Sequence, residues 1–269
     1  PNPVTVLPKL VTVCPYIAQY MTDTFRVTIK GFRCACARCE STSKNANAEK
    51  TLTGWRCADS LCVGVAAHDA FATTEDESPL EDLLICSTCL SGTAVGGVSK
   101  RDATGAETRW RTAIDKSREF GRNGDHAESS KIASDTLAEC ANSLHKDHVV
   151  QHELRLALTA ASVKLGDWRV VANTARATVV SMAKGSCFLL NGSHPGLADA
   201  RNTLADALER IYGDEGDTQG DKSDLLEEAL VNRTAMCEAL RVAYGDEHDA
   251  TKKAVAKRDV LEGKRRTEK

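Results

Sequence analysis

The uneven distribution of cysteine is the feature that most constrains what this chain can fold into. Eleven cysteines occur among 269 residues, and eight of them lie within the first 89. An odd total does not close into a disulfide framework, and no basic stretch followed by an apolar run opens the sequence as a secretory signal would. We therefore expect free thiolates in a reducing compartment, the cytoplasm or the nucleus.

Two groups of these cysteines have the spacing of metal sites. Three thiols fall within six residues in the first group, and two pairs separated by a 23-residue gap form the second. The groups are Cys34, Cys36 and Cys39, and Cys57-x4-Cys62 with Cys86-x2-Cys89. Cysteine thiolates that are this closely spaced or paired are frequent ligands of tetrahedral Zn²⁺. The spacing predicts two zinc sites; the alternative is that the thiols are simply buried small side chains.

Zinc at these sites would be structural. Residues 31–92 contain few large apolar side chains, too few to stabilise a fold unaided. Structural zinc can contribute about 10–16 kcal/mol of apparent binding energy in small peptides. Four thiolates leave no open coordination position for water or substrate. The metal would therefore organise the segment without taking part in chemistry.

Composition excludes several functional classes. The 35 basic residues are outnumbered by 38 acidic ones, and aromatic residues make up only 4% of the chain. Direct nucleic-acid binding, including that of a zinc ribbon, needs a basic excess and exposed aromatics, so we do not expect it. No apolar run approaches the roughly 20 residues of a membrane span. With so few aromatics, the core must be built from Ala, Leu and Val, which favours helices.

The second half of the chain has helical periodicity. Residues 93–107 are rich in Gly, Ser, Thr and Ala and predict a linker, after which apolar side chains recur at helical spacing from Trp110 onward. The stripes are Ala133, Leu137, Cys140, Ala141 and Leu144; Leu154, Leu158, Ala161 and Leu165; Leu197, Ala200, Leu204, Leu208 and Ile211; and Leu226, Leu230, Cys237 and Leu240.

Turn signals separate these stripes into hairpins. Gly124-Asp125 precedes Gly166-Asp167 by 42 residues, and Gly192-Ser193-His194-Pro195 is echoed by the turn that contains Gly245 and His248. Repeated helical hairpins of this size are typical of tetratricopeptide-like arrays. A His at a helix start most simply caps the turn, and we expect that role for His194 and His248. The expected fold is mainly α: a small zinc-stabilised N-terminal region followed by a tetratricopeptide-like hairpin array over residues 108–263, with a basic tail at 264–269.

The run Phe32-x-Cys34-x-Cys36-x2-Cys39, followed by a linker and by hairpins that contain a Gly-Ser-His-Pro turn, resembles the C-terminal half of the SET–MYND family of protein lysine methyltransferases. The resemblance covers about residues 1–262. It implies that residues 1–30 are the end of the SET core, that 31–92 are the post-SET zinc region and that 108–263 are the helical domain. The second cysteine set looks like an insertion found in many members.

The resemblance also implies roles for individual residues. Tyr16, in Cys14-Pro15-Tyr16-Ile17, would be the catalytic tyrosine, and Phe32 would pack against the methyl donor S-adenosylmethionine. The fourth ligand that accompanies Cys34, Cys36 and Cys39 would lie before residue 1, because Pro1-Asn2 looks like the end of the family motif that supplies it. The substrate would be a lysine of a histone or another protein, and we expect the isolated chain to be inactive as a fragment.

A second interpretation needs no catalysis. A zinc ribbon fused to tetratricopeptide-like hairpins would serve as an adaptor, with the tail of a partner protein lying in the helical groove. This alternative stays open on the sequence alone.

Overall fold

The computed structural model describes residues 53–62, 64–67, 83–86, 88–89, 94, 97–184, 195–213 and 219–267. Several sequence predictions lie outside these residues. They are the roles assigned to Tyr16 and Phe32, the first zinc group of Cys34, Cys36 and Cys39, and the capping role of His194.

Seven helices dominate the described residues, and a small antiparallel sheet precedes them. The helices are α5 (Lys100–Arg122), α6 (His126–Ala141), α7 (Val149–Leu165), α8 (Trp168–Lys184), α9 (Pro195–Tyr212), α10 (Gln219–Tyr244) and α11 (Asp249–Thr267). The strands are β1 (Trp55–Arg56), β2 (Val65–Ala67) and β3 (Ile85–Cys86), in the order β1-β2-β3. Trp55 pairs with Ala66, and Ala66 pairs with Cys86. The mainly helical fold with a small N-terminal region is confirmed.

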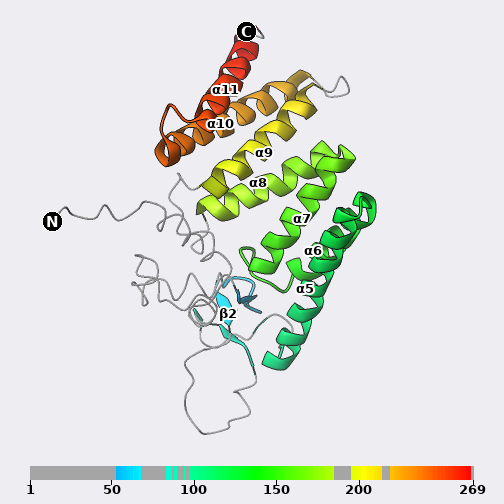
Figure 1. The fold of residues 1–269 in the computed structure, drawn as a ribbon. Coiled ribbons are helices and arrows are strands. Elements are labelled where there is room, and N and C mark those ends of the chain that lie inside the picture. The colour runs from blue at the N-terminus through cyan, green and yellow to red at the C-terminus, as the bar shows by residue number, and fades with distance from the viewer. Residues whose placement is uncertain are drawn as a thin grey trace, which may run out of the picture.

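Each helix packs against the next one along the chain, and α5 also contacts α7. Figure 1 shows the resulting stack, with the small sheet beside α5 and α11 at the far end. Three turns between helices contain glycines with positive φ, at Gly124, Gly166 and Gly245. At Gly166 the backbone is left-handed, with a φ of 75°, and closes α7 as its C-cap. The turns that the sequence predicts at these three glycines are thus confirmed.

Most of the predicted stripe residues face the core. The first core cluster joins α5, α6 and α7 to the sheet, and the second joins α8 to α11. Leu165 is an exception, half exposed as the last residue of α7. Leu144 is fully buried but lies beyond the end of α6, in the loop to α7. Among the described residues, no helix is both long and apolar enough to span a membrane.

The predicted linker at 93–107 is wrong in its second half, because α5 begins at Lys100. Ser99 caps this helix: its hydroxyl accepts a hydrogen bond from the Asp102 N–H at 3.1 Å. Ala103 and Ala106 are buried against the first core, which also contains Trp55 and Leu84. The small residues that suggested a linker are there for close packing. The sheet and α5–α7 therefore share one core.

The predicted basic tail at 264–269 is also partly wrong. Helix α11 continues to Thr267, so Lys264, Arg265 and Arg266 form its last turn. Cations are favoured at this position by the partial negative charge of a helix C-terminus. Arg265 also pairs with Glu227 of α10 at 3.2 Å.

Candidate metal centre

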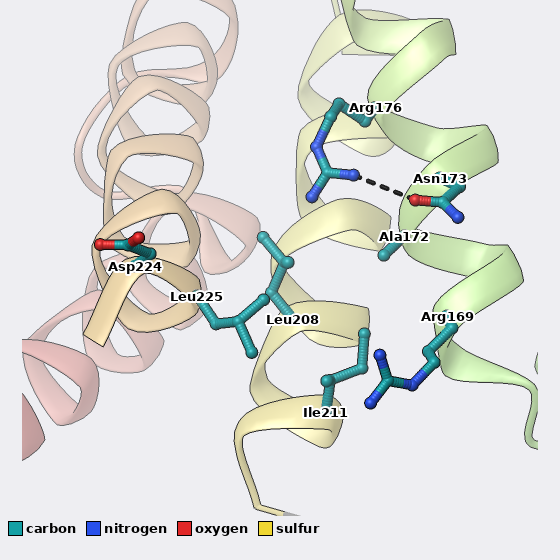
Figure 2. A pocket seen from close by; sticks show the side chains of 8 residues that line it. All are labelled: Arg169, Ala172, Asn173, Arg176, Leu208, Ile211, Asp224 and Leu225. Atoms are coloured by element: carbon teal, nitrogen blue, oxygen red, sulfur yellow. Dashed lines mark hydrogen bonds between the residues drawn. The ribbon is translucent and has the colours of Figure 1, made fainter. Parts of the chain in front are cut away.

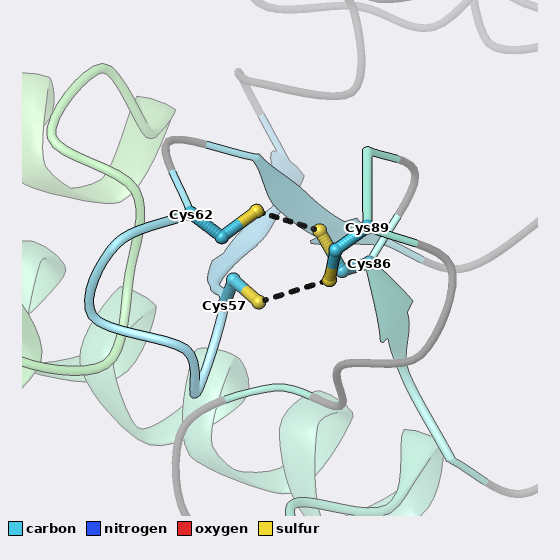
Figure 3. Close-up of side chains that lie close together, drawn as sticks. All are labelled: Cys57, Cys62, Cys86 and Cys89. Carbon is cyan, nitrogen blue, oxygen red and sulfur yellow. Dashed lines mark hydrogen bonds between the residues drawn. The ribbon is translucent and has the colours of Figure 1, made fainter.

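Four cysteines converge beside the sheet. Cys57 follows β1, Cys62 ends the turn after it, Cys86 closes β3 and Cys89 follows three residues later. The four Sγ atoms all lie within 4.8 Å of one another (Figure 3). The second predicted cysteine group is therefore brought together, and the cluster could hold a metal ion.

The sulfur separations fit tetrahedral thiolate coordination. The Sγ atoms of Cys57 and Cys89 are 3.6 Å apart, and those of Cys62 and Cys86 are 3.7 Å apart. A tetrahedron with Zn–S bonds of about 2.3 Å has S–S edges of about 3.8 Å. A disulfide would need about 2.05 Å, so none of the four cysteines is joined to another by a disulfide. The donor set and its dimensions are consistent with zinc.

Local backbone geometry presents the sulfurs. The Asp59 carboxylate accepts a hydrogen bond from the Leu61 N–H at 2.9 Å and tightens the turn between the first two cysteines. The Gly64 N–H donates to Cys62 Sγ at 3.3 Å, and the Thr88 N–H donates to Cys86 Sγ at 3.4 Å. Amide donors of this kind stabilise the thiolate form.

Burial determines how readily the cysteine thiols lose their protons when no metal is bound. Cys86 is fully buried and Cys57 nearly so. Burial raises the pKa of Cys57 to about 12, although a hydrogen bond from the backbone at Asp59 opposes the change. A cation that binds here must therefore displace thiol protons, and its affinity will fall as the pH is lowered.

The sheet that carries the cysteines is held against two parts of the helical stack. Trp55 packs on Trp110 of α5, with ring centroids 5.6 Å apart, and its indole N–H donates to Glu107 Oε1 at 3.4 Å. Backbone hydrogen bonds also join Arg56 to Ser143, at 2.8 Å, and Gly54 to the loop before α7. The cluster is thus a junction between an N-terminal segment and the first helices.

Sequence reasoning missed the polar residues at this junction. His148, fully buried, caps α7: its Nδ1 accepts a hydrogen bond from the Val150 N–H at 3.1 Å. Its Nε2 lies 3.7 Å from the carboxylate of Glu107. Burial alone would raise the pKa of Glu107, but the neighbouring His148 imidazole, together with Trp55 and Arg111, lowers it. The sequence signal for this cap is a single histidine directly before an apolar helical segment.

His248, for which the sequence predicts a capping role, accepts a hydrogen bond from the Ala250 N–H in the same way.

We expect Gly64→Ala to weaken zinc binding about 10–100-fold, the range typical of disturbed outer-shell groups. A Cβ at this position would lie 2.6 Å from Cys86 Sγ and 2.5 Å from Thr88 Oγ1, so a ligand sulfur would have to move. Competition with a chromophoric chelator measures the affinity. Gly105→Ala, in open space on α5, is the matched control and should bind zinc normally. Equal affinities for the two variants would contradict this geometry.

Two hollows lie between helices, away from the cysteines. One of about 360 Å³ is formed by α8, α9 and the start of α10 (Figure 2). Leu208, Ile211 and Leu225 form its apolar side, and Arg176 is already engaged by Asn173 and by both carboxylate oxygens of Glu228. The other hollow, of about 640 Å³, lies between α5, α6 and α7.

No protein family model matches this sequence, and no curated protein matches it either.

Proposed function

We propose that the four-cysteine cluster binds Zn²⁺ as a structural ion. The observation that carries this proposal is the convergence of four cysteine Sγ atoms within 4.8 Å of one another, two of them from buried residues. The ion would fix the sheet against α5 and the loop before α7. Because all four positions are thiolates, no position remains for a substrate or an activated water molecule.

We further propose that the chain is the C-terminal part of a protein lysine methyltransferase of the SET–MYND kind. Support comes from the order of features: a Cys-x-Cys-x2-Cys run, a four-cysteine set, and then a series of consecutive helices. On this proposal Cys34, Cys36 and Cys39 bind a second zinc ion, with a ligand supplied from before residue 1. The substrate is a lysine of a histone or another protein in the cytoplasm or nucleus.

The proposed chemistry assigns distinct tasks to two residues. A lysine amine has an ordinary pKa of about 10.4 and must be neutral to accept a methyl group. An apolar channel disfavours its charged form. The Tyr16 hydroxyl would orient the amine lone pair, and Phe32 would cover the donor site. S-adenosylmethionine, when bound, supplies the activated methyl group.

The test is Tyr16→Phe in the full-length protein encoded by the gene. We expect transfer of tritiated methyl groups to histone or other protein substrates to fall about 100-fold, because removing one preorganised hydrogen-bond donor typically costs that much. Tyr20→Phe, four residues along, is the matched control and should retain activity. Unchanged activity in the Tyr16 variant would remove that residue from the mechanism.

The second candidate is a non-catalytic adaptor. It is favoured by the position of the two hollows, which lie between helices and have no lining residue in common with the cysteine cluster. The coding sequence upstream of Pro1 separates the candidates. A Gly-rich donor loop and an Asn-His-Ser-Cys motif there would support the methyltransferase, whereas an initiating Met directly before Pro1 would support the adaptor.

A further inference from the structure

The larger hollow is a groove between two helices that lie side by side. Helices α5 and α7 contact each other, and both pack on α6. Figure 1 shows the C-terminal ends of α5 and α7 at the same edge of the stack. The groove of about 640 Å³ lies near these ends, within the range of volumes that hold small ligands and short peptide segments.

Small side chains create the groove. Ala157, Ala160 and Ala161 lie on one face of α7, and Gly121 and Ser129 complete the floor from α5 and α6. A Cβ at Gly121 would lie 3.3 Å from Ser129 Oγ, so glycine allows α5 to approach α6 closely at this point. The side chains of the floor are therefore short, and the floor presents mainly methyl groups and backbone atoms.

The charges around this floor are mostly positive. Arg118, Arg122 and Lys164 line the groove together with His126, and Asp115 is the one carboxylate among its lining residues. Arg118 bonds to Glu153 of α7 at 2.8 Å and lies 3.9 Å from Asp115, so its charge is balanced within the protein. Arg122 and Lys164 lie in the last turns of α5 and α7. The chain as a whole has a net charge of -3, so this surface has the opposite sign.

Helix termini explain only part of this arrangement. A cation in the last turn is favoured by the helix dipole, which accounts for Arg122 and Lys164 separately. The dipole does not explain why these two cations, from different helices, line the same groove. Convergence of three helices places all these groups around one apolar floor.

We propose that this groove binds an acidic peptide segment of a partner protein, with small or aliphatic side chains on the alanine floor and carboxylates near Arg122 and Lys164. Nucleic acid fits the surface poorly, because no Phe, Tyr or Trp lines the groove for base stacking. The proposal does not depend on methyltransferase activity or on zinc binding, since its residues lie on α5, α6 and α7 alone.

The test is fluorescence anisotropy of the full chain with a fluorescein-labelled peptide of repeated Glu-Leu-Ala-Asp units. A matched probe carries Lys in place of every Glu and Asp. We expect the acidic probe to bind at least about tenfold more tightly than the basic one, and its affinity to fall as salt is added. Combined charge reversal, Arg122→Glu with Lys164→Glu, should lower the affinity for the acidic probe by at least about tenfold, since each reversal replaces attraction by repulsion.

Two further variants make the result specific to the groove. Ala160→Trp fills it from an exposed position and should also abolish binding. Lys116→Glu changes an exposed cation of α5 that does not line the groove, so its affinity should stay within about twofold of wild type. Circular dichroism checks that each variant keeps its helical content. Equal binding of both probes, tighter binding of a single-stranded oligonucleotide, an unchanged affinity after charge reversal, or a change of oligomeric state in place of peptide binding would overturn the proposal.

Discussion

We expect Cys86→Ser to remove one equivalent of bound zinc and to unfold the small sheet. Cys86 is fully buried, and its Sγ lies 3.7 Å from that of Cys62. The strands contain only two or three residues each, too few to be stable without support. Structural zinc can supply about 10–16 kcal/mol in small peptides, so its loss should exceed what the sheet can replace by packing.

Metal content and amide exchange measure this result. Zinc per chain is determined on the purified wild-type and variant proteins, and hydrogen exchange reports protection at Val65–Ala67. Cys237→Ser is the matched control, because Cys237 is a buried cysteine of α10 in a different core cluster. It should retain all of its zinc and the protection of β2. Equal zinc content in the Cys86 and Cys237 variants would show that the four-cysteine cluster is not a metal site.

The four-cysteine cluster could be predicted from the sequence because its ligands come in two short pairs. Each pair needs only a local turn to present its sulfurs, so spacing alone carries most of the information. The helices were also predictable, because their apolar residues recur at a period of 3.6. Leu204, Leu208 and Ile211, for example, are all buried as their spacing indicates.

What could not be predicted depends on contacts between distant residues. The small residues at the start of α5 predict a linker, and only the burial of Ala103 and Ala106 in the core shared with the sheet reveals their packing role. The contact of Trp55 with Trp110 and Glu107 joins segments more than fifty residues apart. Neither composition nor periodicity contains that information. Tyr16 and Phe32 stay predictions, because their assignment rests on a resemblance.

A buried arginine in the second half of the stack was also missed. Arg233 of α10 is fully buried and reaches Asn202, Asp206 and Glu209, all on α9. Its Nε and Nη2 both donate to Glu209 Oε1, at 3.1 and 2.7 Å. Lys257 of α11 adds a second contact to Asp206 at 3.1 Å. This network links three helices at a point where apolar periodicity predicts only packing.

We expect Arg233→Met to lower the free energy of unfolding by about 2–4 kcal/mol. Removing one partner of a buried ion pair typically costs about 3–5 kcal/mol. The effect should be somewhat smaller here, because the side chains of Asp206 and Glu209 are 41% and 25% exposed and water can reach them. Urea unfolding at pH 7, followed by circular dichroism, measures the difference. Arg265→Met, which breaks the exposed pair with Glu227, is the control and should cost less than about 1 kcal/mol.

The pH dependence of this difference identifies its electrostatic part. Burial would raise the pKa of Asp206, but its hydrogen bond to Arg233, the charge of Arg233 and Lys257 together lower it. A carboxylate with a lowered pKa stabilises the folded state above its unfolded pKa of about 3.9, and this contribution is lost as the pH falls through the folded value. The difference between wild type and Arg233→Met should therefore shrink between pH 7 and about pH 3. An equal difference at both pH values would mean that Arg233 stabilises the stack through packing of its side chain alone.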